Sequence, residues 1–148
     1  VTSSAISGNS AGIRGGGIWN NSTLSISSST ISNNTADNGT ANNNGGGIYN
    51  SGNLSVTSST ISGNQANFGG GIWNSGNLSV TSSTISGNSV GIRGGGIFNN
   101  TNGNLSVSNS TISGNSASGG GGIYNNGSVG VTSSAISGNS AGIRGGGI

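Results

Sequence analysis

The sequence lacks cysteine, histidine, lysine, glutamate, proline and methionine, and its only charged side chains are Arg14, Arg93, Arg144 and Asp37. Metal sites, carboxylate pairs and Ser-His-Asp triads all need residue types that are absent or present once. We therefore expect no enzymatic activity, no metal and no cofactor. Three arginines are too few for a phosphate-backbone interface, so nucleic acid is not an expected partner. No apolar run is long enough to insert into a membrane.

The chain is instead rich in small polar residues, with 33 Gly, 32 Ser, 25 Asn and 12 Thr among 148 residues. Such a composition is typical of disordered, low-complexity segments. Those segments also tend to carry a high net charge, whereas the formal net charge here is only +2. The order of the residues, not their abundance, decides between disorder and a repeat fold.

The sequence repeats with a period of 24 to 30 residues. The unit LSVTSSTISGNQANFGGGIWNSGN occupies residues 54–77 and begins again at Leu78, and related units begin at Leu24, Leu105 and Val129. The length differences fall at two points: between the ISGN-type motif and the Gly triplet, and after the Ile-aromatic-Asn triplet. Insertions confined to two points indicate loops on a fixed scaffold.

Each unit predicts short strands and turns. Leu54 and Val56 alternate with polar residues, as in a half-buried strand, and further strands are expected around Ile61 and Ile72. Collagen is excluded because Gly does not recur at every third position, and a calcium-bound β-roll because Asp is absent from most units. The sequence predicts an all-β parallel β-helix, or β-solenoid, of about six rungs with three strands each. As one domain, 1–148, its rungs are 1–23, 24–53, 54–77, 78–104, 105–128 and 129–148.

Stacking of the rungs is expected to bury four apolar columns, two from the first strand and one from each of the other two, because a single rung cannot offset its own ordering entropy. The expected core is Leu24, Ile26, Ile31, Ile48, Leu54, Val56, Ile61, Ile72, Leu78, Val80, Ile85, Ile97, Leu105, Val107, Ile112 and Ile123. Stacked asparagines can also form hydrogen-bonded amide ladders, or they can serve only as turn formers. The two candidate ladders are Asn9, Asn34, Asn64, Asn88, Asn115 and Asn139, and Asn20, Asn50, Asn74, Asn99 and Asn125.

An ISGN-type motif paired with a GGGI motif resembles the right-handed parallel β-helix repeats of bacterial surface proteins. The most similar group is the polymorphic outer-membrane protein and autotransporter-adhesin repeats, which carry an FxxN motif and a GGA-plus-aliphatic motif. Residues 61–64 stand where FxxN would, with Ile in place of Phe, and residues 69–72 stand where the glycine motif would. The resemblance implies an extracellular or cell-surface location in a bacterium.

One aromatic residue per rung follows the Ile of the GGGI motif. We expect these rings to form a column along one face. The column can pack laterally against another solenoid, bind the apolar faces of sugars, or simply stack on itself, either outside or in the core. Its members are Trp19, Tyr49, Trp73, Phe98 and Tyr124.

Two further surface features are polar. Rows of hydroxyls are expected on the first strand face, a pattern that ice-binding solenoids share with ordinary solvated strands; these are Ser25, Ser27, Ser55, Thr57, Ser79, Thr81, Ser106 and Ser108. The three arginines each precede the Gly triplet inside a GIRGGGI string, where they can contact a phosphate, a sugar acid or another molecule, or only improve solubility. Asp37 is expected to be solvated in the longest loop.

Residues 1–18 are identical to residues 131–148, an offset of 130 residues that spans five rungs and defines a super-repeat over 1–130. We expect a segment of a longer array, or a short chain that stacks end to end on its copies. The expected function is structural, as part of an extracellular filament or surface fibre that self-associates end to end, laterally or both. The alternatives are an adhesin that binds carbohydrate or a host surface and, less favoured, an ice-binding protein.

Overall fold

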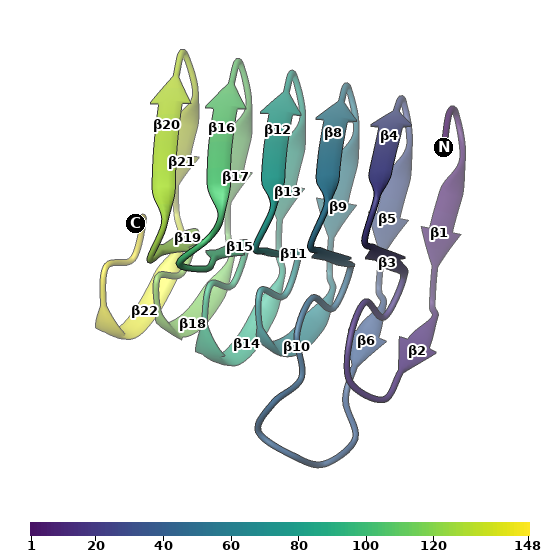
Figure 1. Ribbon diagram of the computed structural model, residues 1–148. Helices are drawn as coiled ribbons and strands as arrows, with labels where there is room; N and C mark the ends of the chain where they lie inside the picture. The colour runs from purple at the N-terminus through teal and green to yellow at the C-terminus, as the bar shows by residue number, and fades with distance from the viewer.

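The computed structural model describes residues 1–148 as a parallel β-solenoid of about six turns (Figure 1). It contains 22 short strands and no helix, and successive rungs lie side by side along one axis. The all-β solenoid class expected from the repeat is confirmed. No helix is available that could cross a membrane.

The strands form four parallel sheets that run along the solenoid. Sheet A consists of β4 (Thr23–Ser27), β8 (Asn53–Thr57), β12 (Asn77–Thr81), β16 (Asn104–Ser108) and β20 (Ser128–Thr132). Sheet B consists of β1 (Ala5–Ser7), β5 (Thr30–Ser32), β9 (Thr60–Ser62), β13 (Thr84–Ser86), β17 (Thr111–Ser113) and β21 (Ala135–Ser137). Sheet C consists of β2 (Ser10–Ala11), β6 (Thr35–Ala36), β10 (Gln65–Phe68), β14 (Ser89–Arg93), β18 (Ser116–Gly119) and β22 (Ser140–Arg144). Sheet D consists of β3 (Ile18–Asn20), β7 (Ile48–Asn50), β11 (Ile72–Asn74), β15 (Ile97–Asn99) and β19 (Ile123–Asn125).

The three strands expected in each rung belong to sheets A, B and D. The structure adds a fourth strand per rung, which belongs to sheet C. Sheet C has a weak sequence signal because its inward residues are mostly small, such as Ala36 and Ala117, and because its register shifts within the strands. It also contains one of the two points at which the rungs differ in length. Alternation of large apolar residues therefore could not reveal it.

The apolar core lies between sheets A, B and D. Fifteen buried residues form one cluster, and all fifteen belong to the expected core. The sixteenth, Leu24, is only partly buried against that cluster. Its strand, β4, is bordered on its outer side only by Val1 and Thr2, so the first half of the strand has no neighbouring strand to cover it.

Candidate functional site

The first asparagine set forms a continuous ladder at the turn between sheets B and C. In its middle, Asn88 Nδ2 donates to Asn115 Oδ1 and to Ile61 O, both at 3.0 Å. Asn88 Oδ1 accepts from the backbone N–H and from Nδ2 of Asn64, again at 3.0 Å. Asn88 is fully buried, and every donor and acceptor of its side chain is used. The amide-to-amide bonds join all six members, from Asn9 to Asn139.

The second asparagine set forms a ladder of its own at the turn between sheets D and A. Its amide-to-amide distances are 2.7–2.8 Å along the whole series from Asn20 to Asn125. The amides also reach backbone carbonyls, as Asn50 Nδ2 does with Asn77 O at 3.2 Å. The two ladders therefore bind each rung to the next at two separate corners of the solenoid.

A third ladder, made of serine, lies at the turn between sheets A and B and was not expected from the sequence. The backbone N–H of Ser59 donates to Ser83 Oγ at 3.1 Å, and Ser83 Oγ donates to Thr81 O at 2.7 Å. The preceding residue, Ser82, adopts a left-handed conformation with φ 49°, which turns the chain between the two sheets. The same contacts recur in neighbouring rungs at buried Ser29, Ser59, Ser83 and Ser110. A signal was available: a Ser-Ser or Asn-Ser pair follows the first strand of every unit.

The aromatic column is present in register along sheet D. The Tyr49 and Trp73 rings are stacked with centroids 4.3 Å apart, and Phe98 and Tyr124 are stacked at 5.4 Å. Tyr49 and Phe98 are buried, whereas Trp19 is 61% exposed. The rings from Tyr49 to Tyr124 therefore form one stacked column along sheet D, in which Trp73 and Tyr124 are half-buried.

Three of the five rings lie against a row of residues at the ends of the sheet C strands or just beyond them. We call this set the cover row; it comprises Arg14, Asn44, Phe68, Arg93, Gly119 and Arg144, which pair in register. Three members lie against the ring of the following rung. The Arg14 guanidinium is 5.1 Å from the Tyr49 centroid, Phe68 meets Phe98 edge-on at 5.5 Å, and the Arg93 guanidinium is 4.9 Å from the Tyr124 centroid.

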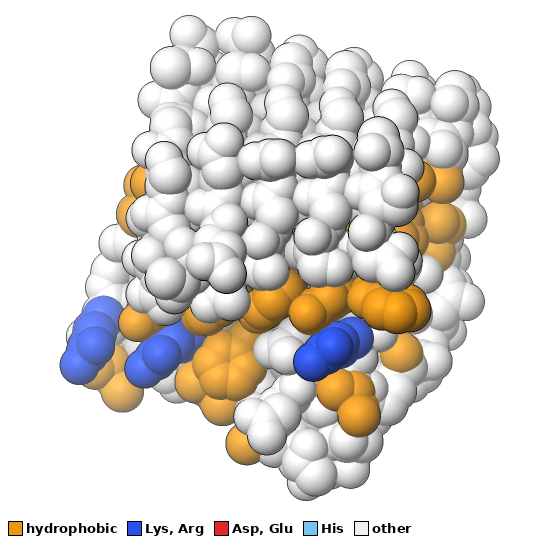
Figure 2. Space-filling model, viewed as in Figure 1, with side chains coloured by type: hydrophobic (Ala, Val, Ile, Leu, Met, Phe, Trp, Pro, Cys, Tyr) orange, Lys and Arg blue, Asp and Glu red, His pale blue; other side chains and the backbone are white.

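The three arginines therefore share one edge of the molecule. Figure 2 shows them (blue) along this edge, next to a row of apolar side chains (orange), with no acidic side chain on the face drawn. Asp37 lies in the loop between β6 and β7, where its Oδ1 accepts from Gly39 N at 2.8 Å and from Asn43 Nδ2 at 3.0 Å. The Asp37 side chain therefore forms hydrogen bonds only within its own loop, and no carboxylate side chain pairs with the arginines.

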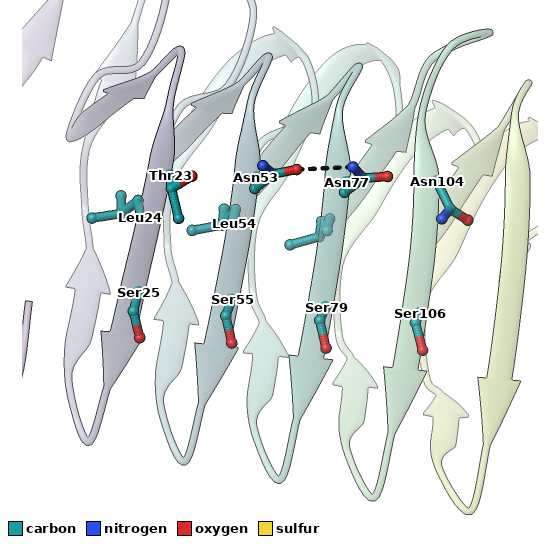
Figure 3. Close-up of a pocket in the computed structure, with 11 residues that line it drawn as sticks. Thr23, Leu24, Ser25, Asn53, Leu54, Ser55, Asn77, Ser79, Asn104 and Ser106 are labelled. Carbon is teal, nitrogen blue, oxygen red and sulfur yellow. Dashed lines mark hydrogen bonds between the residues drawn. The ribbon is translucent and has the colours of Figure 1, made fainter.

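The outer face of sheet A carries the expected hydroxyl rows and, beside them, a row of amides that was not expected from the sequence (Figure 3). A shallow trough of about 330 Å³ runs between the Ser row and a row of Thr23, Asn53, Asn77 and Asn104. Asn77 Nδ2 donates to Asn53 Oδ1 at 2.8 Å on this exposed surface. At β20 the Ser row is interrupted by Gly130, opposite Ser106. The face is therefore a mixed amide and hydroxyl surface and not a uniform hydroxyl grid.

A model of the Chlamydia polymorphic membrane protein (Chlamydia_PMP) repeat matches residues 28–51. The matched segment includes the ISNN motif at 31–34 and the GGGI motif at 45–48. The first motif begins within β5 and contains Asn34 of the first asparagine ladder. The second motif leads into β7, the strand that carries Tyr49. No curated protein and no solved structure matches this chain. One rung is thus similar in sequence to a repeat of a bacterial surface protein, and the resemblance expected from the paired motifs is confirmed.

Proposed function

We propose that this chain is a rigid structural segment of an extracellular bacterial surface fibre, in which solenoids continue one another end to end. Its role in this proposal is mechanical and involves no catalysed step. The similarity to a surface-protein repeat supports the bacterial surface location. The observation that carries the proposal is the continuous asparagine ladder, which binds each rung to the next along the solenoid and can be extended by further rungs.

The terminal rungs expose apolar side chains that interior rungs cover. All five exposed large hydrophobic residues lie in rungs one and six: Val1, Ile13, Trp19, Ile143 and Ile148. Ile13 and Ile143 occupy the same repeat position, and they are 52% and 78% exposed. Burial of such surface against a further rung is favourable whether that rung belongs to the same polypeptide or to a second copy.

The first asparagine ladder also ends in complementary groups. Asn9 donates to Asn34 Oδ1, but its own Oδ1 accepts no hydrogen bond within the chain. At the other end Asn139 Oδ1 accepts from Asn115, and Asn139 Nδ2 donates only to Ile112 O. One end therefore offers a free acceptor and the other a free donor. A rung added at either end in the same register would extend the ladder.

Carbohydrate binding by an adhesin is the second candidate, but the aromatic column does not support it. Its central rings are stacked on one another and covered by Arg14, Phe68 and Arg93. Trp19 is exposed and Trp73 and Tyr124 are half-buried, but Tyr49 and Phe98 between them are buried, so the column offers no continuous run of open rings. Lateral association through this column would meet the same obstacle, so we favour the end-to-end mode.

Sedimentation velocity over a range of concentrations tests the end-to-end mode. We expect the unsubstituted chain to form species whose mass rises in steps of 14.0 kDa with concentration. Ile143→Asp should weaken this association at least tenfold, because it places a charge on the surface that the next rung would bury. Ile92→Asp is the matched control, since Ile92 holds the same repeat position in an interior rung. A chain that stays monomeric at every concentration, or one that both substitutions affect equally, would contradict end-to-end association.

A further inference from the structure

The cover row has a gap in rung five. Gly119 pairs with Arg93 on one side and with Arg144 on the other, and it contributes no side chain to the row. The result is a notch of about 180 Å³ lined by Ile92, Arg93, Ser118, Gly119, Tyr124, Ile143 and Arg144. Rungs two and three have no such notch, because Asn44 and Phe68 occupy the same position there.

The two guanidiniums flank a space that suits one anionic group. Their strands are two strand spacings apart, about 10 Å, a distance that two extended Arg side chains can close on a shared ligand. The sole carboxylate side chain, Asp37, bonds to Gly39 and Asn43 in a different part of the chain. Each guanidinium presents five N–H donors in a planar fork, which matches a carboxylate in a bidentate way.

Apart from the arginines, the notch is lined by Tyr124, Ile92, Ile143, Gly119 and Ser118. The Arg93 guanidinium lies 4.9 Å from the Tyr124 centroid, so the ring holds this arginine in place. Tyr124 in turn stacks on Phe98 with an interplanar angle of 1°. Ile143 is 78% exposed. A ligand that fits must therefore combine an anionic oxygen pair with a compact, partly apolar body.

We propose that this notch binds a uronate residue of an acidic polysaccharide. The carboxylate would lie between Arg93 and Arg144, and the apolar face of the pyranose ring would rest against Tyr124 and the two isoleucines. A bare phosphate would use the two arginines but would leave the apolar side chains without a contact. This function does not require the rod role, and because a further rung would cover Ile143, we expect it at an uncovered end of the solenoid.

Isothermal titration calorimetry with short alginate oligomers at about 0.15 M salt tests the proposal on the 148-residue chain. We expect binding to one site and about a tenfold loss of affinity for Arg93→Gln and for Arg144→Gln, as expected when one charge-assisted contact is removed. Gly119→Phe should abolish binding by filling the notch. The backbone tolerates this change: a Cβ at Gly119 would lie 3.6 Å from the nearest atom, Tyr124 Cε2, and Phe68 is the residue at this position in rung three.

Arg14→Gln is the matched control, because it removes the same charge from the same row beside Asn44 instead of Gly119. Affinity within twofold of the unsubstituted chain is expected for this variant. An equal loss for Arg14→Gln and Arg93→Gln would show that only net charge matters and would overturn the site. Retained binding by Gly119→Phe would overturn it as well. Polyphosphate that binds as tightly as alginate, with the same response to the variants, would overturn the uronate assignment, and neutral dextran should not bind.

Discussion

Replacing Asn88 with alanine is expected to lower the free energy of unfolding by roughly 3–6 kcal/mol. The substitution removes four hydrogen bonds: two from Asn64 to Asn88 Oδ1 and two from Asn88 Nδ2, to Asn115 Oδ1 and Ile61 O. The groups that lose their partners lie at fully buried positions, and each carries a desolvation cost once unpaired. Urea unfolding followed by circular dichroism measures the change.

Asn77→Ala is the matched control for this prediction. Asn77 is exposed on sheet A and makes one side-chain bond, to Asn53 Oδ1, so its loss should cost less than about 1 kcal/mol. Similar losses for the two variants would show that the buried ladder adds nothing beyond ordinary turn formation.

The Asn88→Asp variant tests the same buried site through the pH dependence of its stability. The new carboxyl would face Asn115 Oδ1 and Ile61 O, both acceptors, in a fully buried site. Burial and these oxygens would raise the pKa of the new carboxyl in the folded state above its unfolded value of about 3.9. The folded state then binds more protons, so the stability of this variant should fall as pH rises above about 4. The unsubstituted chain has only seven titratable groups and provides the baseline.

Gly71→Ala is expected to cost about 3 kcal/mol, and Gly71→Val more. A Cβ at Gly71 would lie 2.6 Å from Gly96 O and 3.1 Å from Asn88 Nδ2. The glycine triplet therefore leaves room for both the neighbouring rung and the ladder amide. Because Gly96 O accepts the backbone N–H of Ile72 at 2.9 Å, it cannot move away without loss of a rung-to-rung bond.

Gly91→Ala is the companion variant for this second prediction. Gly91 is exposed in β14, and a Cβ there would have only Asn67 Oδ1 nearby, at 3.8 Å. Its stability should stay within about 0.5 kcal/mol of the unsubstituted chain or rise slightly, since alanine has less backbone entropy to lose. The measurement is thermal and urea unfolding of both variants. Equal stability for Gly71→Ala and Gly91→Ala would contradict the close packing described for the triplet.

Most of the architecture could be predicted because identical residues recur at identical positions. Alternation around Leu54 and Val56 located sheet A, and the isolated isoleucines Ile61 and Ile72 located sheets B and D. Sheet C could not be located in this way. Of its buried side chains only Val90 is large, beside Ala36 and Ala117, and its rungs differ in length, so no repeated alternation marks its strands.

The contacts around the aromatic column could not be predicted for a related reason. Sequence spacing places Trp73 and Phe98 in one column, but it does not show that Phe68 and Arg93 fold back over the following rung. This contact depends on the path of sheet C.

The serine ladder depends on a left-handed turn at Ser58 and Ser82. Serine is not a strong sequence signal for that conformation.

Electron microscopy and electron diffraction of native surface material test the structural role most directly. We expect long, unbranched filaments with a meridional repeat near 4.8 Å, the spacing between parallel strands of successive rungs. This result is expected whether the rungs belong to one long polypeptide or to stacked copies. Short, discrete particles that do not lengthen with concentration and show no such repeat would contradict the role as a fibre segment.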